Sequence, residues 1–181
     1  MNQQSKKSLS IVSQSEISPS ENVRPIFIIE DDPDFAEIYQ KHLKRNFPEI
    51  PVRIFYNAIE ANAAFSELSE EELPSLIILD VLLTGPDGFT LLNELLSYPE
   101  TSQIPVLLIS SLNLSQISLR AYNVRAILNK ETFTPEDFLN KVQDILKSTN
   151  NLSAQNDDLA MRGLEGSHAW SAHWGDCALA C

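Results

Sequence analysis

The stretch LIILDVLL, residues 76–83, places a single carboxylate, Asp80, inside a run of branched apolar residues. A strand of this composition is expected to lie in the core of a sheet. Burying a carboxylate there without a partner costs a large amount of free energy. Either the strand ends at Asp80 or this carboxylate has a partner, and the rest of the chain shows which.

The overall composition indicates a globular protein and argues against nucleic-acid-binding and membrane-spanning classes. The chain has 181 residues, of which 43% are hydrophobic, enough to bury one sizeable core. Its formal net charge of −12 argues against a nucleic-acid surface, because phosphate contacts need an excess of Lys and Arg. No apolar run approaches the roughly 20 residues that span a bilayer. We therefore expect a cytoplasmic protein with neither a nucleic-acid nor a membrane partner.

Apolar runs that predict strands alternate with segments of helical periodicity. The predicted strands are PIFIIE (25–30), VRIFY (52–56), SLIILD (75–80), IPVLLIS (104–110) and VRAILNK (124–130). Helices are predicted at residues 32–47, 57–68, after the turn PDG (86–88), at 114–122, and from residue 135 onward. Strict alternation implies a doubly wound α/β fold, with a five-stranded parallel sheet covered on both faces. The continuous runs fit central strands, whereas VRIFY alternates and fits an edge.

Two helix starts carry clear capping signals. Asp32 is predicted to be an N-cap, followed by Pro33 in the first turn. Thr134 and Pro135 have the same arrangement, with two acids near the positive end of the helix dipole. These signals fix where the first and last helices begin.

Chemically active side chains follow several of the predicted strands. In open parallel sheets, ligands gather beyond the carboxyl ends of the strands. Those ends carry Glu30 and Asp31, then Asp80, Ser110 and Lys130. We therefore expect the strand to end at Asp80, so that its carboxylate meets other acids outside the core.

Three carboxylates within a few ångströms repel one another and need a proton or a cation. An all-oxygen site with access to water suits Mg²⁺. Taken singly, an acid at a strand end is equally well explained as a helix cap or a solvated loop charge, and Asp32 is assigned to that role. The combination across several strands favours a binding site.

The segments IFIIEDDP, IILDVLLTGPDG, PVLLISS and ILNK together resemble the receiver domain of two-component response regulators. The resemblance runs from about Pro25 to Ser148 and implies the flavodoxin-like strand order 2-1-3-4-5. It implies that Asp80 is the phosphoacceptor, which receives a phosphoryl group from a histidine kinase or a phosphotransfer protein. Such a domain signals by binding a downstream protein partner, and is not an enzyme beyond self-catalysed phosphotransfer and dephosphorylation.

The resemblance also implies roles for the neighbouring residues. Asp31, Asp80 and the backbone carbonyl of Leu82 would bind Mg²⁺ directly, and Glu30 would contribute through water. Lys130 would pair with a phosphoryl oxygen, since an ammonium group is a compact point charge. The Ser110 hydroxyl would move toward the new phosphate.

The chain departs from the receiver pattern on the side of the fifth strand. Ile127 occupies a position that is often aromatic in receivers, so the usual coupling to the hydroxyl residue cannot operate in that form. Glu131 replaces a proline that often follows a cis bond, and a cis bond without proline costs about 2.5 to 4 kcal/mol. We expect a trans bond there and a shifted loop. These differences fall on the face that receivers commonly use for output and dimerisation (the output face), so we expect that face to be altered. The interval between Ser110 and Lys130 is also about two residues shorter than usual, which would trim the fourth helix.

Two apolar residues flank the predicted phosphoryl site. Leu82 and Leu112 occupy positions where polar side chains could orient an attacking water. The hypothesis that follows is slow self-dephosphorylation.

The two ends of the chain differ from its centre. Residues 1–24 are predicted to be a disordered leader, residues 25–148 the receiver-like domain, and residues 149–181 a flexible tail whose odd composition favours a non-native origin. The tail is too short for an independent output domain, so we expect a stand-alone receiver. A zinc site is the other interpretation of the tail, although the spacing of its potential ligands matches no usual finger pattern. These ligands are His168, His173, Cys177 and Cys181.

Three other functions compete with the phosphorylated switch. A hydrolase of the haloacid dehalogenase type would need a second acid two residues after Asp80, where Leu82 stands. A flavin carrier would need a loop that cradles phosphate, and EDDP would repel one. A pseudo-receiver scaffold, which binds partners without phosphorylation, is compatible with the altered output face.

Overall fold

The computed structural model describes residues 23–114, 119 and 121–164. The predicted zinc ligands, all but the end of the predicted leader, and much of the helix predicted at residues 114–122 lie outside the described residues.

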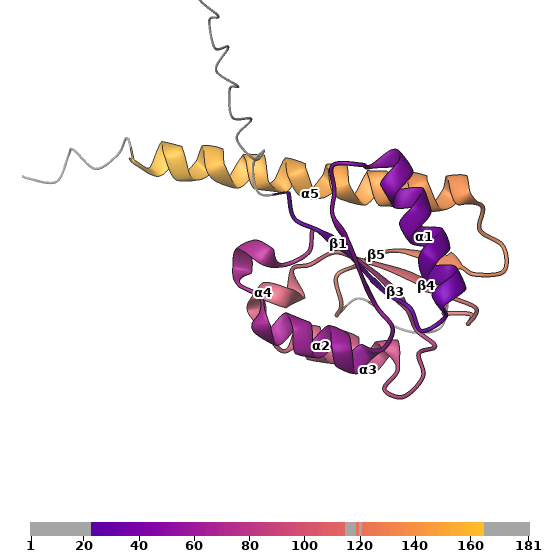
Figure 1. Ribbon diagram of the computed structural model, residues 1–181. Helices are drawn as coiled ribbons and strands as arrows, with labels where there is room; N and C mark the ends of the chain where they lie inside the picture. Colours follow the sequence, from indigo (N-terminus) through magenta and orange to yellow (C-terminus); the bar gives the residue numbers. More distant parts are fainter. Residues whose placement is uncertain (1–22, 115–118, 120, 165–181) are drawn as a thin grey trace, which may run out of the picture.

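Five parallel strands form one sheet in the order β2-β1-β3-β4-β5 (Figure 1). Their bounds are β1 Ile26–Ile29, β2 Val52–Phe55, β3 Leu76–Asp80, β4 Val106–Ser110 and β5 Val124–Asn129. Every residue of β1, β3 and β4 is buried, whereas β2 and β5 are partly exposed edges. The predicted fold, the strand order and the edge position of VRIFY are therefore confirmed.

Helices cover both faces of the sheet. In Figure 1, α1 (Pro33–Asn46) and α5 (Pro135–Leu164) lie on one side, and α2 (Ala58–Glu67) and α3 (Gly88–Leu96) lie on the other. Alternate residues of each strand supply the two cores. Ile26 and Ile28 pack toward α1 and α5, whereas Phe27 and Ile29 pack toward α2 and α3.

Local capping explains where two of these helices begin. Asp32 caps α1, its carboxylate accepting a hydrogen bond from the Asp34 N–H at 2.9 Å. At α5, the Thr134 hydroxyl accepts from the Asp137 N–H at 3.2 Å and donates to the Asp137 carboxylate at 2.7 Å. Both predicted caps are confirmed, because each satisfies a backbone donor that the first helical turn leaves free.

The structure adds elements that the sequence patterns do not predict. A 3₁₀ turn, η1 (Glu70–Glu72), precedes β3, and a short helix, α4 (Pro99–Ser102), starts at a proline after α3. Helix α5 continues to Leu164, past the predicted domain boundary at Ser148. Its added turns contain no proline, and the glycine among them, Gly163, comes at the end. The boundaries of leader, domain and tail stay a prediction.

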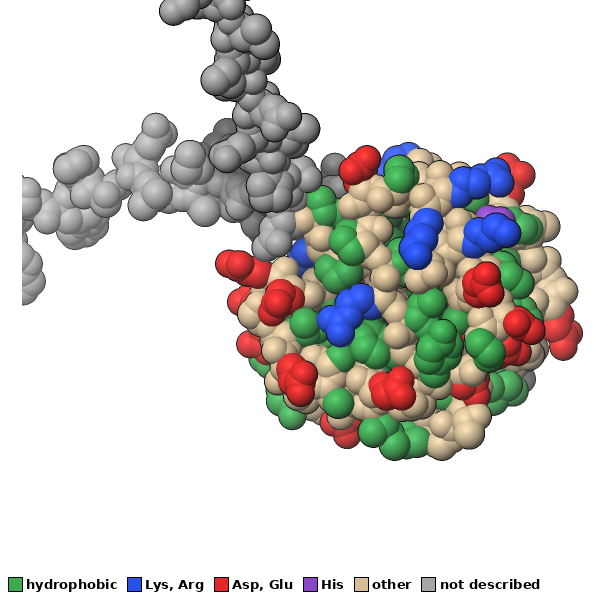
Figure 2. Space-filling view, in the orientation of Figure 1, with side chains coloured by type: hydrophobic (Ala, Val, Ile, Leu, Met, Phe, Trp, Pro, Cys, Tyr) green, Lys and Arg blue, Asp and Glu red, His purple; other side chains and the backbone are tan. Residues whose placement is uncertain are grey.

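Figure 2 shows acidic side chains spread around the visible face, with Lys and Arg side chains interspersed among them. On this face, the negative charge of the chain is therefore distributed and interrupted by basic groups. Within the part of the chain that the structure describes, no helix combines the length and apolarity needed to cross a membrane.

Candidate functional site

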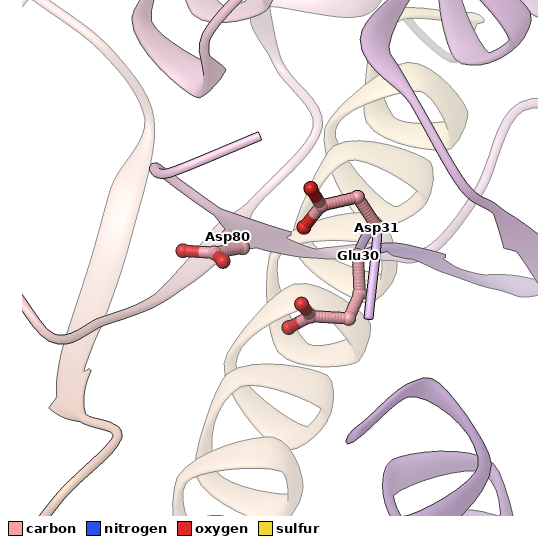
Figure 3. Close-up of side chains that lie close together, drawn as sticks. All are labelled: Glu30, Asp31 and Asp80. Atoms are coloured by element: carbon pink, nitrogen blue, oxygen red, sulfur yellow. The ribbon is translucent and has the colours of Figure 1, made fainter. Parts of the chain in front are cut away.

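The period-two alternation of the strands brings the predicted site together. Glu30, Asp80 and Lys130 each continue, at or just beyond a strand end, the face that packs toward α1 and α5. The residues two positions earlier on that face are Ile28, Ile78 and Leu128. Figure 3 shows the acidic side chains of Glu30, Asp31 and Asp80 close to one another at the ends of β1 and β3. One carboxylate oxygen from each lies within 4.8 Å of the others.

Lys130 is the cation paired with this cluster. Its Nζ lies 2.6 Å from Oδ2 of Asp80, and 2.9 Å and 2.7 Å from Oε1 and Oε2 of Glu30. Both explanations for a carboxylate within LIILDVLL therefore hold. Strand β3 ends at Asp80, and the carboxylate, which is buried, has a partner.

The charge states follow from burial and pairing. Burial raises the pKa of Glu30, although Lys130 opposes the shift. Burial alone would lower the pKa of Lys130, but its hydrogen bonds to Asp80 and Glu30 outweigh that effect and raise it. Lys130 is therefore held as an ammonium ion at neutral pH.

Asp31 is held by a different set of contacts. Its Oδ2 accepts hydrogen bonds from the N–H of Thr84 at 2.9 Å and from the Thr84 hydroxyl. Partial burial raises the pKa of Asp31, but these two hydrogen bonds outweigh it and lower that pKa. Sequence reasoning missed Thr84, because the pair is 53 residues apart and no local pattern joins them.

Gly88 sets how closely α3 approaches the end of β3. Its N–H donates to the Val81 carbonyl at 3.0 Å. A Cβ at this position would lie 2.5 Å from the Asp80 carbonyl oxygen and 2.8 Å from the Cα of Val81. Only glycine fits without displacing the backbone of the phosphoacceptor candidate. The PDG motif therefore marks a close approach as well as a turn.

Ser110 lies at the end of β4, but on the other face of the sheet. It continues the face of Val106 and Leu108, which pack toward α2 and α3. The buried Ser110 hydroxyl accepts a hydrogen bond from the Leu112 N–H at 3.1 Å. Ser111, in contrast, lines the cleft beside Asp80 and Lys130. A contact between Ser110 and a group on Asp80 would require the hydroxyl to move.

Lys130, just after β5, is positioned by contacts with β4 and α1. The Lys130 N–H donates to the Ser110 carbonyl at 3.1 Å, and the ammonium lies 4.7 Å from the centre of the Phe35 ring. Asn129 accepts from the Glu131 N–H at 2.8 Å and so closes the turn. All described peptide bonds are trans, as predicted for Lys130 and Glu131. Phe35 lies in α1, far from Lys130 in the chain, and no local sequence pattern predicts their contact.

Three apolar residues around the site are exposed. Leu82 lines the cleft, Leu112 follows the cleft residue Ser111 in the chain, and Ile127 lies on the edge strand β5. Leu82 donates its N–H to Oδ1 of Asp80 at 2.9 Å, which anchors the loop after β3 to the carboxylate.

The residues present fit a hard divalent cation. The cluster holds three carboxylates and one ammonium, which pairs with Glu30 and Asp80, so among the described residues the carboxylates outnumber their ion-pair cation by two. Carboxylate and carbonyl oxygens with access to an open cleft are the ligands that Mg²⁺ prefers.

Comparisons with known proteins agree with this geometry. The family model "Response regulator receiver domain" matches residues 26–143. The DNA-binding dual master transcriptional regulator RpaA of Synechocystis sp. is 29% identical over 129 residues, which cover 70% of this chain and 51% of that protein. The chain thus spans about half the length of RpaA, and 36% of another curated relative, the transcriptional regulatory protein GltR of Pseudomonas aeruginosa.

Two solved structures are similar over nearly their whole length. The phosphorylated cyanobacterial phytochrome response regulator RcpA is 26% identical, with a TM-score of 0.58, and the match covers 70% of this chain and 95% of that one. The signal receiver domain of a histidine kinase from Syntrophus aciditrophicus is 26% identical, with a TM-score of 0.59 and coverage of 69% and 91%. These matches favour a receiver over the hydrolase and the flavin carrier. The chain belongs to the family of response regulator receiver domains.

Proposed function

We propose that Asp80 accepts a phosphoryl group from a histidine kinase or a phosphotransfer protein, with Mg²⁺ bound, and that the chain then signals by binding a downstream protein partner. The observation that carries this proposal is the contact of the buried Asp80 carboxylate with the Lys130 ammonium, beside two further acids. The solved structure of RcpA, which is similar to this chain, is of a phosphorylated form.

The proposed transfer uses the chain's own groups in a defined order. An oxygen of Asp80 forms a bond to phosphorus while the bond between phosphorus and the donor's histidine nitrogen breaks. Lys130 then releases Oδ2 of Asp80 and pairs with an oxygen of the transferred group, which keeps the buried charge compensated. Its second ion pair, with Glu30, holds the ammonium in the cleft during this exchange.

Mg²⁺ would be held directly by Asp31, Asp80 and the backbone carbonyl of Leu82, and by Glu30 through water. When bound, it supplies positive charge that offsets the charge of the carboxylates and of the phosphoryl oxygens. Asp31 is suited to this role because its hydrogen bonds from Thr84 favour the ionised carboxylate.

Ser110 is the proposed link between phosphorylation and output. Its hydroxyl starts on the face toward α2 and α3, hydrogen-bonded to the Leu112 N–H. Movement toward a phosphoryl oxygen would break this bond and shift the loop after β4. As a member of a signalling family, the chain is proposed to work in the cytoplasm and to catalyse only its own phosphorylation and dephosphorylation.

Acetyl phosphate provides a direct test. The parent chain and Asp80→Asn are incubated with acetyl phosphate and Mg²⁺, and their intact masses are measured. We expect a phosphoryl adduct on the parent alone. An adduct of equal yield on Asp80→Asn would place the phosphoacceptor elsewhere.

A pseudo-receiver scaffold is the second candidate, and one contact favours it. In this structure the Lys130 ammonium pairs with Oδ2 of Asp80 at 2.6 Å, so phosphorylation would require this ion pair to break. A scaffold would keep that contact permanently and bind its partner unmodified. The absence of an adduct on both proteins, with metal present, would favour this function.

A further inference from the structure

Thr84 joins the two loops that carry the candidate metal ligands. Asp31 lies in the loop after β1, and Thr84 lies in the loop after β3, two residues beyond Leu82. The Thr84 N–H donates to Oδ2 of Asp31 at 2.9 Å, and its hydroxyl donates to the same oxygen. The contact therefore ties a carboxylate from one loop to the backbone of the other.

This contact has a geometric consequence for the cluster. Two donors on one oxygen fix the rotation of the Asp31 carboxylate, which lies within 4.8 Å of Glu30 and Asp80. Carboxylates this close repel one another, and a free Asp31 would turn outward toward water. The hydrogen bonds from Thr84 oppose that movement.

The same contact fixes the loop after β3. Leu82 is anchored at one end by its N–H bond to Asp80, and Thr84 is anchored two residues later to Asp31. The Leu82 carbonyl lies between these two anchors. Its direction is therefore set by hydrogen bonds to the same two carboxylates that are candidate ligands.

We propose that Thr84 is a positioning residue for the metal site, and that its hydroxyl and amide hold Asp31 and the Leu82 carbonyl in place for Mg²⁺. This inference rests on the proposed function, since it requires Mg²⁺ to bind at the acidic cluster. Hydrogen bonds to a ligating carboxylate orient it, and removing such a bond typically weakens metal binding by about tenfold or more.

The chain contains a matched control for this contact. Thr90 donates its N–H at 2.8 Å and its hydroxyl at 2.9 Å to one oxygen of Asp87, at the start of α3. The chemistry is the same, both contacts are exposed, and the two threonines are close in the chain. Asp87, however, is a helix cap outside the acidic cluster.

The test measures Mg²⁺ affinity by isothermal titration calorimetry on the full chain, as the parent, Thr84→Val, Thr84→Ser and Thr90→Val. We expect about tenfold weaker binding for Thr84→Val, because valine keeps the shape but lacks the hydroxyl. Thr84→Ser should bind within about twofold of the parent, since serine retains the donor. Thr90→Val should lower the melting temperature and leave the affinity unchanged.

A second measurement does not depend on the metal. Amide hydrogen exchange of residues 82–87 is followed in metal-free protein, and we expect faster exchange in Thr84→Val than in Thr84→Ser. If the parent binds Mg²⁺ and Thr84→Val binds it equally well, Thr84 does not position the site, and the proposed function stands. If Thr90→Val weakens Mg²⁺ binding as much as Thr84→Val does, the effect is a general loss of stability, and this result would also overturn the inference. If the parent chain neither binds Mg²⁺ nor forms the phosphoryl adduct, both the proposed function and the inference about Thr84 are overturned.

Discussion

The edge of the sheet where the parallel strands end has two halves, one formed by β1 and β3 (the β3 half) and one formed by β4 and β5 (the β5 half). The two halves differ in how their residues relate to the site. At β1 and β3, Glu30, Asp31 and Asp80 form one compact group, held by hydrogen bonds from the loops. At β4 and β5, the Ser110 hydroxyl lies on the opposite face and Ile127 is exposed. The residues proposed for phosphoryl chemistry are thus organised separately from those expected to report it, and the ammonium of Lys130 reaches from one half to the other.

The largest effect on stability is expected when the Lys130 ammonium, which connects the two halves, is removed. Lys130→Met leaves the carboxylates of Glu30 and Asp80, which are 1% and 3% exposed, without their cation. Breaking a buried ion pair costs about 3 kcal/mol or more. Urea unfolding at neutral pH should show this loss, and Mg²⁺ should recover part of it. Lys147→Met, on the exposed side of α5, is the control and should be nearly neutral.

The pH dependence of Lys130→Met gives a further check. Burial already raises the pKa of Glu30 above its ordinary value, and the loss of the ammonium should raise it more. A carboxyl group whose pKa is higher in the folded state destabilises the protein when it ionises. The deficit of Lys130→Met should therefore shrink as the pH falls through that raised pKa. If Lys130→Met loses the same free energy of unfolding at every pH, the unpaired buried charge of Glu30 is not the cause of the loss.

Much of this arrangement could be predicted from the sequence. The continuous apolar runs of β1, β3 and β4 and the helical periodicities between them determine the order of the elements. Because parallel strands end at one edge of a sheet, the acids and Lys130 had to converge. The position of Asp80 at the end of its strand follows from the same argument.

Other features could not be read from local patterns. The contact between Thr84 and Asp31 and that between Lys130 and Phe35 join segments far apart in the chain. They depend on loop conformations that no periodicity encodes. The short helix α4 depends on a single proline after α3, which is too little signal for a prediction. The direction of Ser110, in contrast, follows from strand alternation and was available from the sequence.

Gly88 offers a way to disturb the β3 half alone. Gly88→Ala would place a methyl group 2.5 Å from the Asp80 carbonyl oxygen, and overpacking of this kind costs about 1 to 3 kcal/mol. We expect lower stability together with a lower yield of the phosphoryl adduct, because the backbone of Asp80 must shift.

Gly85→Ala is the matched comparison. Gly85 has a φ of 90°, and a Cβ there would contact nothing within 4 Å. We therefore expect Gly85→Ala to lower the free energy of unfolding only through the strained backbone conformation of alanine, by about 1 kcal/mol. The adduct yield should therefore stay close to that of the parent. Equal yields for Gly88→Ala and Gly85→Ala would show that the approach of α3 does not control the site.

A smaller, kinetic effect is expected at Leu82. This side chain is 49% exposed beside the site and offers no polar group to orient an attacking water. The phosphorylated parent should lose its phosphoryl group slowly, and Leu82→Asn should speed the loss about threefold or more. Phosphate release after removal of acetyl phosphate measures the rate. Leu96→Asn, an exposed leucine of α3, should not change it. Loss from the parent within seconds would contradict slow self-dephosphorylation.

The smallest effect concerns the start of α5, which follows the β5 half of the site. Hydrogen bonds from Thr134 hold the pKa of Asp137 below its ordinary value of 3.8. The stability contributed by ionised Asp137 is therefore complete above that ordinary pKa and is lost as the pH falls through the lowered folded value. The melting-temperature difference between the parent and Thr134→Val should accordingly be largest near neutral pH and shrink in acid. Because Asp137 lies outside the acidic cluster, Mg²⁺ should not alter this difference. A difference that changes with Mg²⁺ would mean that the β5 half senses the metal, and that the two halves are coupled more closely than their contacts indicate.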